Sequence, residues 1–367
     1  MKNFEFHIPT KIIFSRGGIS RLGSILRPFE DNILIVTDKI VSSKSPAVEA
    51  ARENLKDRTV AVFDDVEENP SIDTITRGKK TAVSNKADII VGIGGGSCMD
   101  AAKGIAVLAT NPGEIGVYMA GKSLENKPLP NICIPTTSGT GSEVTPYAVF
   151  TDREKKSKGA IGFEEIFPRV ALVDPELTYT MPENVIVSTG MDVLTHAVEA
   201  YLSTESFKMN DMLALHAIEI VRDNLPVARD GDKGAMDAMA YASTLGGIAI
   251  AHASTILLHI MAYPLTVYHN IPHGKANAIL LPEFLNFMRE KSTVIEKVVR
   301  LDSMFEKVGG IQAFVNSLGI STSLSEYGVD PGEFANFAGK TIIRGDIKIT
   351  PATITKESIV DIYQKAL

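Results

Sequence analysis

The periodicity of the apolar residues changes part-way along the chain, and this change limits the folds that the chain can adopt. From Asn32 to about Val173, short β-rich runs alternate with helical stretches. Such alternation favours a mostly parallel sheet that helices cover on both faces. From Asn184 onward, long amphipathic or apolar helical patterns follow, and little of the chain is typical of strands. The sequence therefore predicts an α/β domain followed by an all-α domain.

The strands expected in the first part are short and apolar: Ile33–Thr37, Thr59–Phe63, Ile89–Ile93, Ile132–Pro135 and Val170–Val173. Helices are expected there at Pro46–Leu55, Ile72–Lys86 and Cys98–Ala109. Those expected in the second part are Val185–Leu202, Met209–Asn224, Gly234–Ser254, Thr255–Met261 and Ala276–Met288, with shorter ones up to Leu367. A proline-bearing segment from Asp174 to Glu183 separates the parts, because neither helix nor strand continues easily through it. We expect one domain over residues 1–180 and another over residues 181–367.

Composition excludes several classes of protein. The chain has 367 residues, 44% of them hydrophobic, which is enough to form large cores. A net charge of −7 and the absence of a long basic cluster argue against a nucleic-acid surface. Two cysteines cannot form a disulfide framework, no signal-peptide core begins the chain, and no apolar run approaches the roughly 20 residues that span a bilayer. We expect a cytoplasmic protein that binds neither nucleic acid nor membrane.

A glycine-rich turn follows the apolar run at Ile89–Ile93. Gly92-Ile93-Gly94-Gly95-Gly96-Ser97 leads through Asp100 into a helical stretch. A buried strand that passes through glycines to a helix N-terminus presents backbone N–H groups to a phosphate. The turn departs from the usual dinucleotide fingerprint, because Ser97 stands where a third glycine would fall. Gly95, Gly96, Ser97 and Asp100 are the candidate cofactor-binding residues here.

A second polar turn follows Ile132-Cys133-Ile134. It runs from Pro135 to Thr145 and contains Thr136, Thr137 and Thr140 among its hydroxyl residues. Hydroxyls and backbone amides at this density can line the other side of a bound nucleotide, although Ser and Thr clusters also cap helices or form ordinary loops. Two such turns in one domain favour a nucleotide site.

Four residues in the second part have the types and spacing of ligands for one divalent metal ion: Asp192, His196, His259 and His273. Asp192 and His196 lie four apart in a helical stretch, so both side chains project from one face. One carboxylate with three imidazoles suits Fe²⁺ or Zn²⁺ better than Mg²⁺ or Ca²⁺. Since a single histidine on an apolar helix is more often a core residue, the hypothesis depends on the whole set.

These motifs, taken in order, resemble those of the iron-containing, or group III, alcohol dehydrogenase family. They are Gly94-Gly95-Gly96-Ser97-x-x-Asp100, Pro135-Thr136-Thr137-x-Gly139-Thr140-Gly141-Ser142-Glu143-Val144-Thr145, Gly190-x-Asp192-x-Leu194-x-His196-Ala197-x-Glu199, His259, and Pro272-His273-Gly274-x-x-x-Ala278-Ile279. The resemblance implies an N-terminal nucleotide-binding domain, a helical domain that holds the metal, and NAD(P)-dependent interconversion of alcohols with aldehydes or ketones. We expect the active site in the cleft between the two domains.

The resemblance also implies roles for single residues. Asp38 lies where the family has its adenosine-ribose selector; a carboxylate there would accept hydrogen bonds from the ribose and repel a 2′-phosphate, so we expect NAD in preference to NADP. The alternative is an Asp that closes a strand and starts a turn. Asn69 and Lys158, the latter expected in a loop after Asp152, match family nucleotide contacts, but each could equally be a turn or surface residue.

Departures from the family pattern concern the substrate. Tyr263 stands where many members have a second histidine four residues after the third ligand. A phenol is a poor metal ligand but can pass a proton, so Tyr263 is the candidate catalytic residue. Ser254-Thr255-Ile256 replaces a usual Gly-x-Gly before the third ligand, and the Asn-Pro-Arg frequent near the C-terminus of longer members is missing.

Three alternatives remain at this stage: a glycerol dehydrogenase-like enzyme, a lyase similar to dehydroquinate synthase, and a non-catalytic nucleotide- or metal-binding protein. A lyase of that kind needs several Lys and Arg near the metal, whereas the neighbours of His259 are apolar. The apolar neighbourhood favours short primary alcohols, diols or their aldehydes as substrates. Pairing of N-terminal strands such as Phe4–Ile8 and Lys11–Phe14 across subunits is plausible for the family, so we expect a homodimer or larger homo-oligomer.

Overall fold

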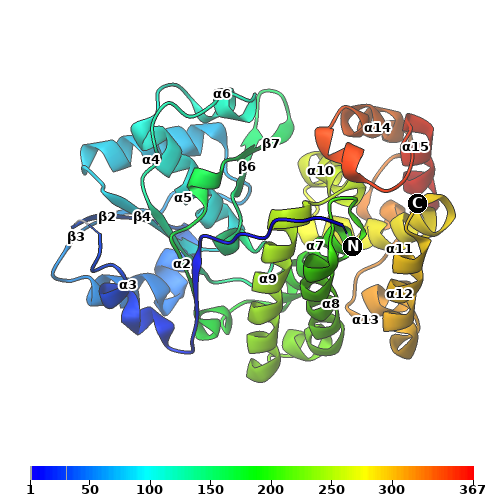
Figure 1. Ribbon diagram of the computed structural model, residues 1–367, viewed down its shortest axis with the longest axis horizontal. Helices are drawn as coiled ribbons and strands as arrows, with labels where there is room; N and C mark the ends of the chain where they lie inside the picture. Colours follow the sequence, from blue (N-terminus) through cyan, green and yellow to red (C-terminus); the bar gives the residue numbers. More distant parts are fainter. Residues whose placement is uncertain (1, 30) are drawn as a thin grey trace. The chain divides into compact units, whose positions relative to one another are not determined.

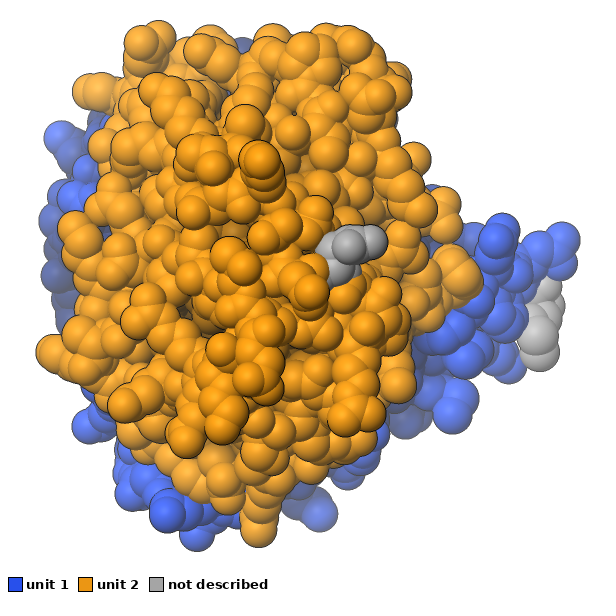
Figure 2. All heavy atoms as spheres, turned by 90° about the vertical axis from the view of Figure 1, so that its left-hand side faces the viewer, with its two compact units in different colours: residues 1–6, 182–367 blue, residues 7–181 orange. Residues whose placement is uncertain are grey.

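The chain folds into two compact units, which Figure 2 distinguishes by colour. The computed structural model describes residues 2–29 and 31–367, so residue 1, where the expected first domain begins, lies outside the described part. One unit comprises residues 7–181 and is called the α/β unit here; the other comprises residues 1–6 and 182–367 and is called the helical unit.

A six-stranded parallel sheet forms the centre of the α/β unit (Figure 1). Its strands stand in the order β1-β8-β5-β4-β2-β3, and every neighbouring pair is parallel. Their bounds are β1 Lys11–Phe14, β2 Asn32–Val36, β3 Thr59–Phe63, β4 Ile89–Gly94, β5 Asn131–Pro135 and β8 Val170–Val173. The prediction of a mostly parallel sheet is confirmed.

Alternate residues of the central strands enter two separate cores. Leu34 and Ile90 pack in one core with residues of α4 and α5, while Ile33 and Val91 pack in the other with residues of α3. Because side chains alternate across a strand, this arrangement needs consecutive apolar residues, as at Ile33–Val36 of β2 and Ile89–Val91 of β4. The continuous apolar runs in the sequence are therefore the mark of a sheet covered on both faces.

The helices of this unit follow the strands closely. Their bounds are α1 Leu22–Ile25, α2 Lys39–Lys44, α3 Pro46–Asn54, α4 Ile72–Ser84, α5 Gly96–Thr110 and α6 Ile115–Met119. An antiparallel hairpin, β6 Tyr147–Asp152 with β7 Ser157–Gly162, was not predicted. Lys158 consequently lies on β7, and its expected position in a loop is wrong. β7 contains one lysine and two glycines and follows a charged turn, so the hairpin gives little apolar alternation.

The helical unit confirms the prediction of an all-α second part (Figure 1). Its helices are α7 Glu183–Leu202, α8 Lys208–Arg229, α9 Lys233–Ala253, α10 Leu257–His269, α11 His273–Lys291, α12 Ile295–Phe305, α13 Ile311–Ser317, α14 Phe334–Ile342 and α15 Lys356–Lys365. Among the described residues, no single helix is long and apolar enough to cross a membrane; only α9 and α10 taken together are, and the chain bends by 112° between them.

Two helices continue past a proline where the sequence predicted an end. α8 passes through Pro226 and α10 through Pro264, so the expected ends at Asn224 and Met261 are wrong. A proline removes one helical hydrogen bond. Ala262 and Leu265, which lie near Pro264 on α10, are fully buried, and this packing compensates for the loss. The longer α10 places Tyr263 one turn after His259 on the same helix face.

The N-terminal segment forms no strand over Phe4–Ile8, contrary to expectation. Instead, the Phe4 ring stacks on Phe207 with centroids 4.5 Å apart, and the Phe6 ring stacks on His252 at 4.3 Å. These ring contacts hold the segment against the helical unit. The expected strand Lys11–Phe14 is present as β1, an edge strand that pairs with β8 of the same chain.

Candidate functional site

Three of the four expected metal ligands converge inside the helical unit. One donor atom each from Asp192, His196 and His259 lies within 4.8 Å of the other two, and all three residues are buried. The imidazole rings of His196 and His259 stack with centroids 4.5 Å apart, and His259 Nε2 lies 3.5 Å from Asp192 Oδ1. Two helices supply these side chains, because α7 bears Asp192 and His196 while α10 bears His259.

The fourth expected ligand, His273, borders this group as the first residue of α11. Its Nε2 lies 3.9 Å from Asp192 Oδ1, and its ring lies edge-on to that of His259 with centroids 5.2 Å apart. Gly274 allows this approach, because a Cβ there would stand 1.9 Å from the Ser188 carbonyl oxygen of α7. The first turn of α11 therefore packs directly on the backbone of α7, one turn before Asp192.

Glu199 orients His259; it belongs to the family motif in the sequence, but no role was predicted for it. It lies on α7, fully buried, and its carboxylate accepts a hydrogen bond from His259 Nδ1. The same carboxylate accepts the backbone N–H groups of Ile256 at 2.8 Å and His259 at 3.3 Å, which would otherwise lack partners at the start of α10. With Nδ1 directed at Glu199, Nε2 is the nitrogen that faces Asp192.

Electrostatics favour a positive charge within this group. Burial alone would lower the pKa of His259, but Glu199 and Asp192 raise it to about 9. Burial would raise the pKa of Asp192, but the three neighbouring histidines hold it well below its usual range. A divalent cation would supply the charge that two buried carboxylates demand, and the donor set of one carboxylate and imidazoles fits Fe²⁺ or Zn²⁺.

Asn277 lies on α11 one turn after His273 and contacts two of these donors. Its amide Nδ2 lies 3.1 Å from Asp192 Oδ1 and 3.1 Å from His259 Nε2, and the residue is fully buried. The amide therefore fixes the positions of a carboxylate from α7 and an imidazole from α10. Asn277 lies four residues after the expected ligand His273, and Glu199 lies three residues after His196. This spacing puts each residue on the same helix face as a ligand and could have identified both from the sequence.

In the α/β unit, the glycine turn lies at the carboxyl end of β4. Gly94 has a φ of 148°, which favours glycine, and Gly95 is the N-cap of α5. A Cβ on Gly96 would stand 2.5 Å from Thr140 Cγ2, so the first turn of α5 touches the second polar turn. α5 begins at Gly96, two residues earlier than expected, so Gly96 and Ser97 belong to its first turn.

The second polar turn follows β5 and lies beside the first. The Thr136 N–H donates to the Gly94 carbonyl at 3.0 Å, and the Thr137 side chain lies 3.3 Å from a Cβ built on Gly95. Thr140 Oγ1 accepts a hydrogen bond from the Ser142 N–H at 3.3 Å. The two turns that the sequence predicted as a nucleotide site are thus in direct contact.

Three further expected residues are linked to the glycine turn. Lys158 Nζ donates to Asn69 Oδ1 at 2.6 Å, and the Asn69 N–H donates to Ser97 Oγ at 3.1 Å. Asn69 has a φ of 57°, a left-handed conformation that asparagine tolerates better than most residues. This arrangement places an ammonium group and an amide next to the N-terminus of α5.

Asp38 has a structural role at the start of α2. It is the N-cap of α2, where Oδ1 accepts from the N–H groups of Ile40 and Val41 at 2.8 Å each. Its Oδ2 accepts a hydrogen bond from the Cys98 thiol at 3.2 Å. The side chain is therefore fixed at the carboxyl end of β2, beside the glycine turn.

Comparison with known proteins assigns the family. The family model for iron-containing alcohol dehydrogenase matches residues 9–175. The family model for the C-terminal region of Fe-containing alcohol dehydrogenases matches residues 186–367. The chain belongs to the iron-containing alcohol dehydrogenase family. It is an oxidoreductase that acts on alcohols.

Individual relatives agree with this assignment. Alcohol dehydrogenase 4 of Saccharomyces cerevisiae is 33% identical over 98% of this chain and 98% of its own length. The NAD-dependent methanol dehydrogenase of Bacillus methanolicus is 30% identical over 99% of this chain and 100% of its own. The crystal structure of an iron-containing alcohol dehydrogenase from Thermotoga maritima is 36% identical, covers 100% of this chain and 99% of that chain, and has a TM-score of 0.92.

Tyr263 of this alcohol dehydrogenase lies beside the metal-ligand candidates. Its ring stacks on that of His273 with centroids 5.5 Å apart, and the Arg344 guanidinium lies 5.6 Å from the centre of the Tyr263 ring. Burial raises the pKa of Tyr263 to about 12, so the group is a neutral phenol at neutral pH. It can donate a hydrogen bond from that position.

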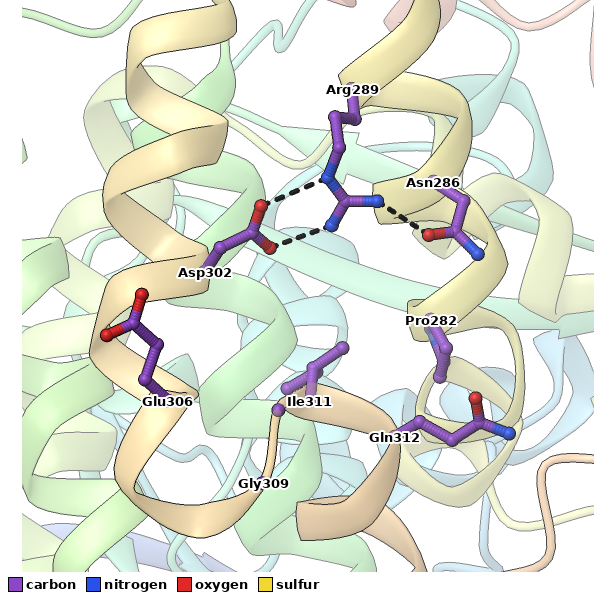
Figure 3. Close-up of a pocket in the computed structure, with 9 residues that line it drawn as sticks. Pro282, Asn286, Arg289, Asp302, Glu306, Gly309, Ile311 and Gln312 are labelled. Atoms are coloured by element: carbon purple, nitrogen blue, oxygen red, sulfur yellow. Dashed lines mark hydrogen bonds and ion pairs between the residues drawn. The ribbon is translucent and has the colours of Figure 1, made fainter.

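A groove of the helical unit lies elsewhere on this protein (Figure 3). α11, α12 and the start of α13 line it, and Arg289 faces Asp302 across it with two hydrogen bonds of 2.8 and 3.0 Å. The Arg289 guanidinium also donates to Asn286 Oδ1 at 2.6 Å. None of the residues predicted for the metal or the nucleotide lines this groove.

Proposed function

We propose that this alcohol dehydrogenase uses one divalent metal ion, Fe²⁺ or Zn²⁺, and NAD to interconvert short-chain alcohols or diols with their aldehydes. The observation that carries the proposal is the convergence of Asp192, His196 and His259, whose donor atoms lie within 4.8 Å of one another. The family of the chain supports hydride transfer to a nicotinamide, and the name of the Bacillus methanolicus relative specifies NAD and a small alcohol.

Asp192, His196, His259 and His273 would hold the metal ion. When bound there, a divalent cation lowers the pKa of an alcohol hydroxyl and polarises a carbonyl in the reverse direction. The protein's own contribution is positional: Glu199 fixes the ring of His259, and Asn277 fixes Asp192. With a single carboxylate among its ligands, the ion together with these ligands would carry a net positive charge, which favours an anionic oxygen.

The two polar turns of the α/β unit would bind the dinucleotide. Gly95, Gly96 and Ser97 offer backbone N–H groups in the first turn of α5, and the helix dipole adds to their attraction for a diphosphate. The hydroxyl residues Thr136, Thr137 and Thr140 lie on the adjoining turn, while Asn69 and Lys158 add polar groups at its side. Asp38 at the end of β2 would accept the ribose hydroxyls and disfavour NADP.

Tyr263 would donate or relay a proton next to His273. The stacking of its ring on that imidazole holds the phenol at the edge of the ligand group. Because the phenol is neutral at neutral pH, it would act as a hydrogen-bond donor to the substrate oxygen in the direction of aldehyde reduction.

We further propose a homodimer in a reducing, cytoplasmic setting. β1 is an edge of the six-stranded sheet, and its Ile12 and Phe14 are 38% and 44% exposed, so a second copy could add a strand there. Both cysteines, Cys98 and Cys133, are buried and unbridged, as is usual for proteins of reducing compartments.

The function is tested with protein purified without oxygen and assayed with C2 to C4 alcohols, diols and aldehydes under NAD and NADP. We expect NADH formation that depends on bound Fe²⁺ or Zn²⁺. His196→Ala should lose both the metal and the activity, whereas His216→Ala, at a half-exposed histidine of α8, should keep both. Full metal content and activity in His196→Ala would contradict the proposal, as would the absence of turnover on every alcohol and aldehyde.

A further inference from the structure

The α/β unit contains a buried lysine that takes no part in the proposed binding of the metal, the dinucleotide or the substrate. Lys103 lies on α5, two turns after Gly96, and none of its surface is exposed. Burying an ammonium group is costly unless hydrogen-bond acceptors replace its hydration. Lys103 can therefore be buried in the middle of this mostly apolar helix only if such acceptors surround it.

The ammonium of Lys103 binds the segment that returns from the second polar turn. Nζ donates to the carbonyl oxygens of Ser142, Tyr147 and Thr145 at 2.6, 2.8 and 3.0 Å. These three carbonyls match the three hydrogens of an ammonium group, and the hydroxyls of Ser142 and Thr145 lie at 2.7 and 3.4 Å. One side chain thus fixes the backbone at three points within six residues.

Asp100 fixes the same segment from one turn earlier on α5. Its Oδ1 accepts the Ser142 hydroxyl at 2.6 Å, and its Oδ2 accepts the Val149 N–H at 2.9 Å. Each carboxylate oxygen therefore has a partner within the protein. Burial raises the pKa of Asp100 and lowers the pKa of Lys103, because it disfavours the charged form of each group. The attraction between the two opposite charges acts against both shifts.

These contacts fix both limbs of the second polar turn to α5. The outgoing limb touches the first turn of the helix through Thr137 and Thr140 against Gly95 and Gly96. The returning limb is held by Asp100 and Lys103. The buried hydrogen bonds of Asp100 and Lys103 therefore set the distance between the hydroxyls of the turn and the N–H groups at the start of α5.

We propose that Lys103, together with Asp100, is a positioning residue for the dinucleotide site: it fixes the second polar turn against α5 without touching the cofactor. The inference rests on the proposed function, because it assumes that the two turns bind the dinucleotide. It changes the expected role of Asp100 from contact with the cofactor to support of the turn that makes contact.

The test compares Ser142→Ala and Lys103→Met with Thr178→Ala. Ser142→Ala removes one hydroxyl that both Asp100 and Lys103 bind, so it is the mild variant. Thr178 is a matched control, since it is a buried hydroxyl of the same unit that donates to the Pro175 carbonyl at 2.7 Å and makes no hydrogen bond to either turn. The readouts are the Kd for NADH by fluorescence titration, kcat and KM for the alcohol at saturating NAD, the metal content and the Tm.

We expect Ser142→Ala to raise the Kd for NADH about tenfold, since hydrogen bonds to charged groups are lost, and Lys103→Met to raise it further. KM for the alcohol and the metal content should stay as in wild type, and kcat should change by less than about twofold because the turn acts on binding. Thr178→Ala should lower the Tm without changing the Kd for NADH.

Wild-type affinity for NADH in Ser142→Ala would overturn the inference, and so would an equal rise in Kd in Ser142→Ala and Thr178→Ala. If Lys103→Met does not fold, Ser142→Ala decides the question. If the proposed function is wrong, the wild-type protein itself will bind no dinucleotide. That result differs from the two above, and it would also overturn the inference.

Discussion

Gly274 is the position at which one added methyl group should disturb the metal ligands most directly. In Gly274→Ala, the new Cβ would stand 1.9 Å from the Ser188 carbonyl oxygen, 2.9 Å from the Ser188 carbonyl carbon and 3.0 Å from Asp192 Cβ. Two of these atoms belong to the backbone of α7 and cannot rotate away. α11 must therefore move away from α7, and His273 moves with it.

The size of the effect follows from these distances. Ordinary van der Waals contact begins at 3.4 Å, so the helices must separate by about 1.5 Å at this point. Overpacking of a rigid contact costs about 3 kcal/mol, which lowers the Tm of a unit of this size by about 6–12 °C. A displacement of about 1 Å at a reacting centre reduces catalysis about 100-fold, and disturbed ligand geometry weakens metal binding by about 10- to 100-fold.

The assay measures metal content, Tm and kcat/KM for the alcohol in Gly274→Ala and in Gly339→Ala. Gly339 lies within α14 with nothing inside 4 Å of an added Cβ, so the same substitution there should raise stability by about 0.5–1 kcal/mol and leave activity unchanged. The reasoning is refuted if Gly274→Ala keeps wild-type metal content, Tm and activity.

Four further predictions concern single positions. Ser254, with φ 58° and ψ 176°, occupies a backbone region that favours glycine, so Ser254→Gly should raise the free energy of unfolding by about 1 kcal/mol in a urea titration; a lower value would show that no strain is relieved. Asp38→Gly should raise the NADP/NAD ratio of kcat/KM, and an unchanged ratio would remove the role in cofactor choice. Tyr263→Phe should lower kcat about 100-fold or more with metal content unchanged, while full activity with an unaltered pH profile would eliminate the proton relay. Burial raises the pKa of Cys133 to about 12 and that of Cys98 well above its usual range, so both thiols stay protonated at pH 8 and native protein should not react with a thiol reagent that modifies both after denaturation; rapid labelling of the native protein would contradict this.

The sequence predicted the parts of the fold whose signals are local. β2 and β4 are continuous apolar runs because both of their faces are buried, and such runs are visible without knowledge of their neighbours. The β6–β7 hairpin could not be predicted in this way, since β7 contains two glycines and a lysine in six residues. α10 was predicted too short because the effect of Pro264 is local, whereas the packing that maintains the helix comes from distant residues.

The candidate site shows the same limit. Asp192 and His196 could be proposed as a pair because four residues separate them on one helix. Glu199 is 60 residues from the histidine that it orients, so its hydrogen bond to His259 becomes evident only when α7 and α10 pack together. Lys103 likewise finds its acceptors about 40 residues away, and no local pattern gives their position.

The central claim is that Asp192, His196, His259 and His273 bind one metal ion on which alcohol oxidation depends. The most direct measurement is a titration of metal-free protein with Fe²⁺ under anaerobic conditions, and in parallel with Zn²⁺, in which bound metal and NADH formation are followed together. We predict that one ion binds per chain and that activity rises in proportion until one equivalent is bound, for at least one of the two metals. Full activity in the metal-free protein, or binding that is unaffected when His196 and His259 are both replaced by alanine, would contradict the account.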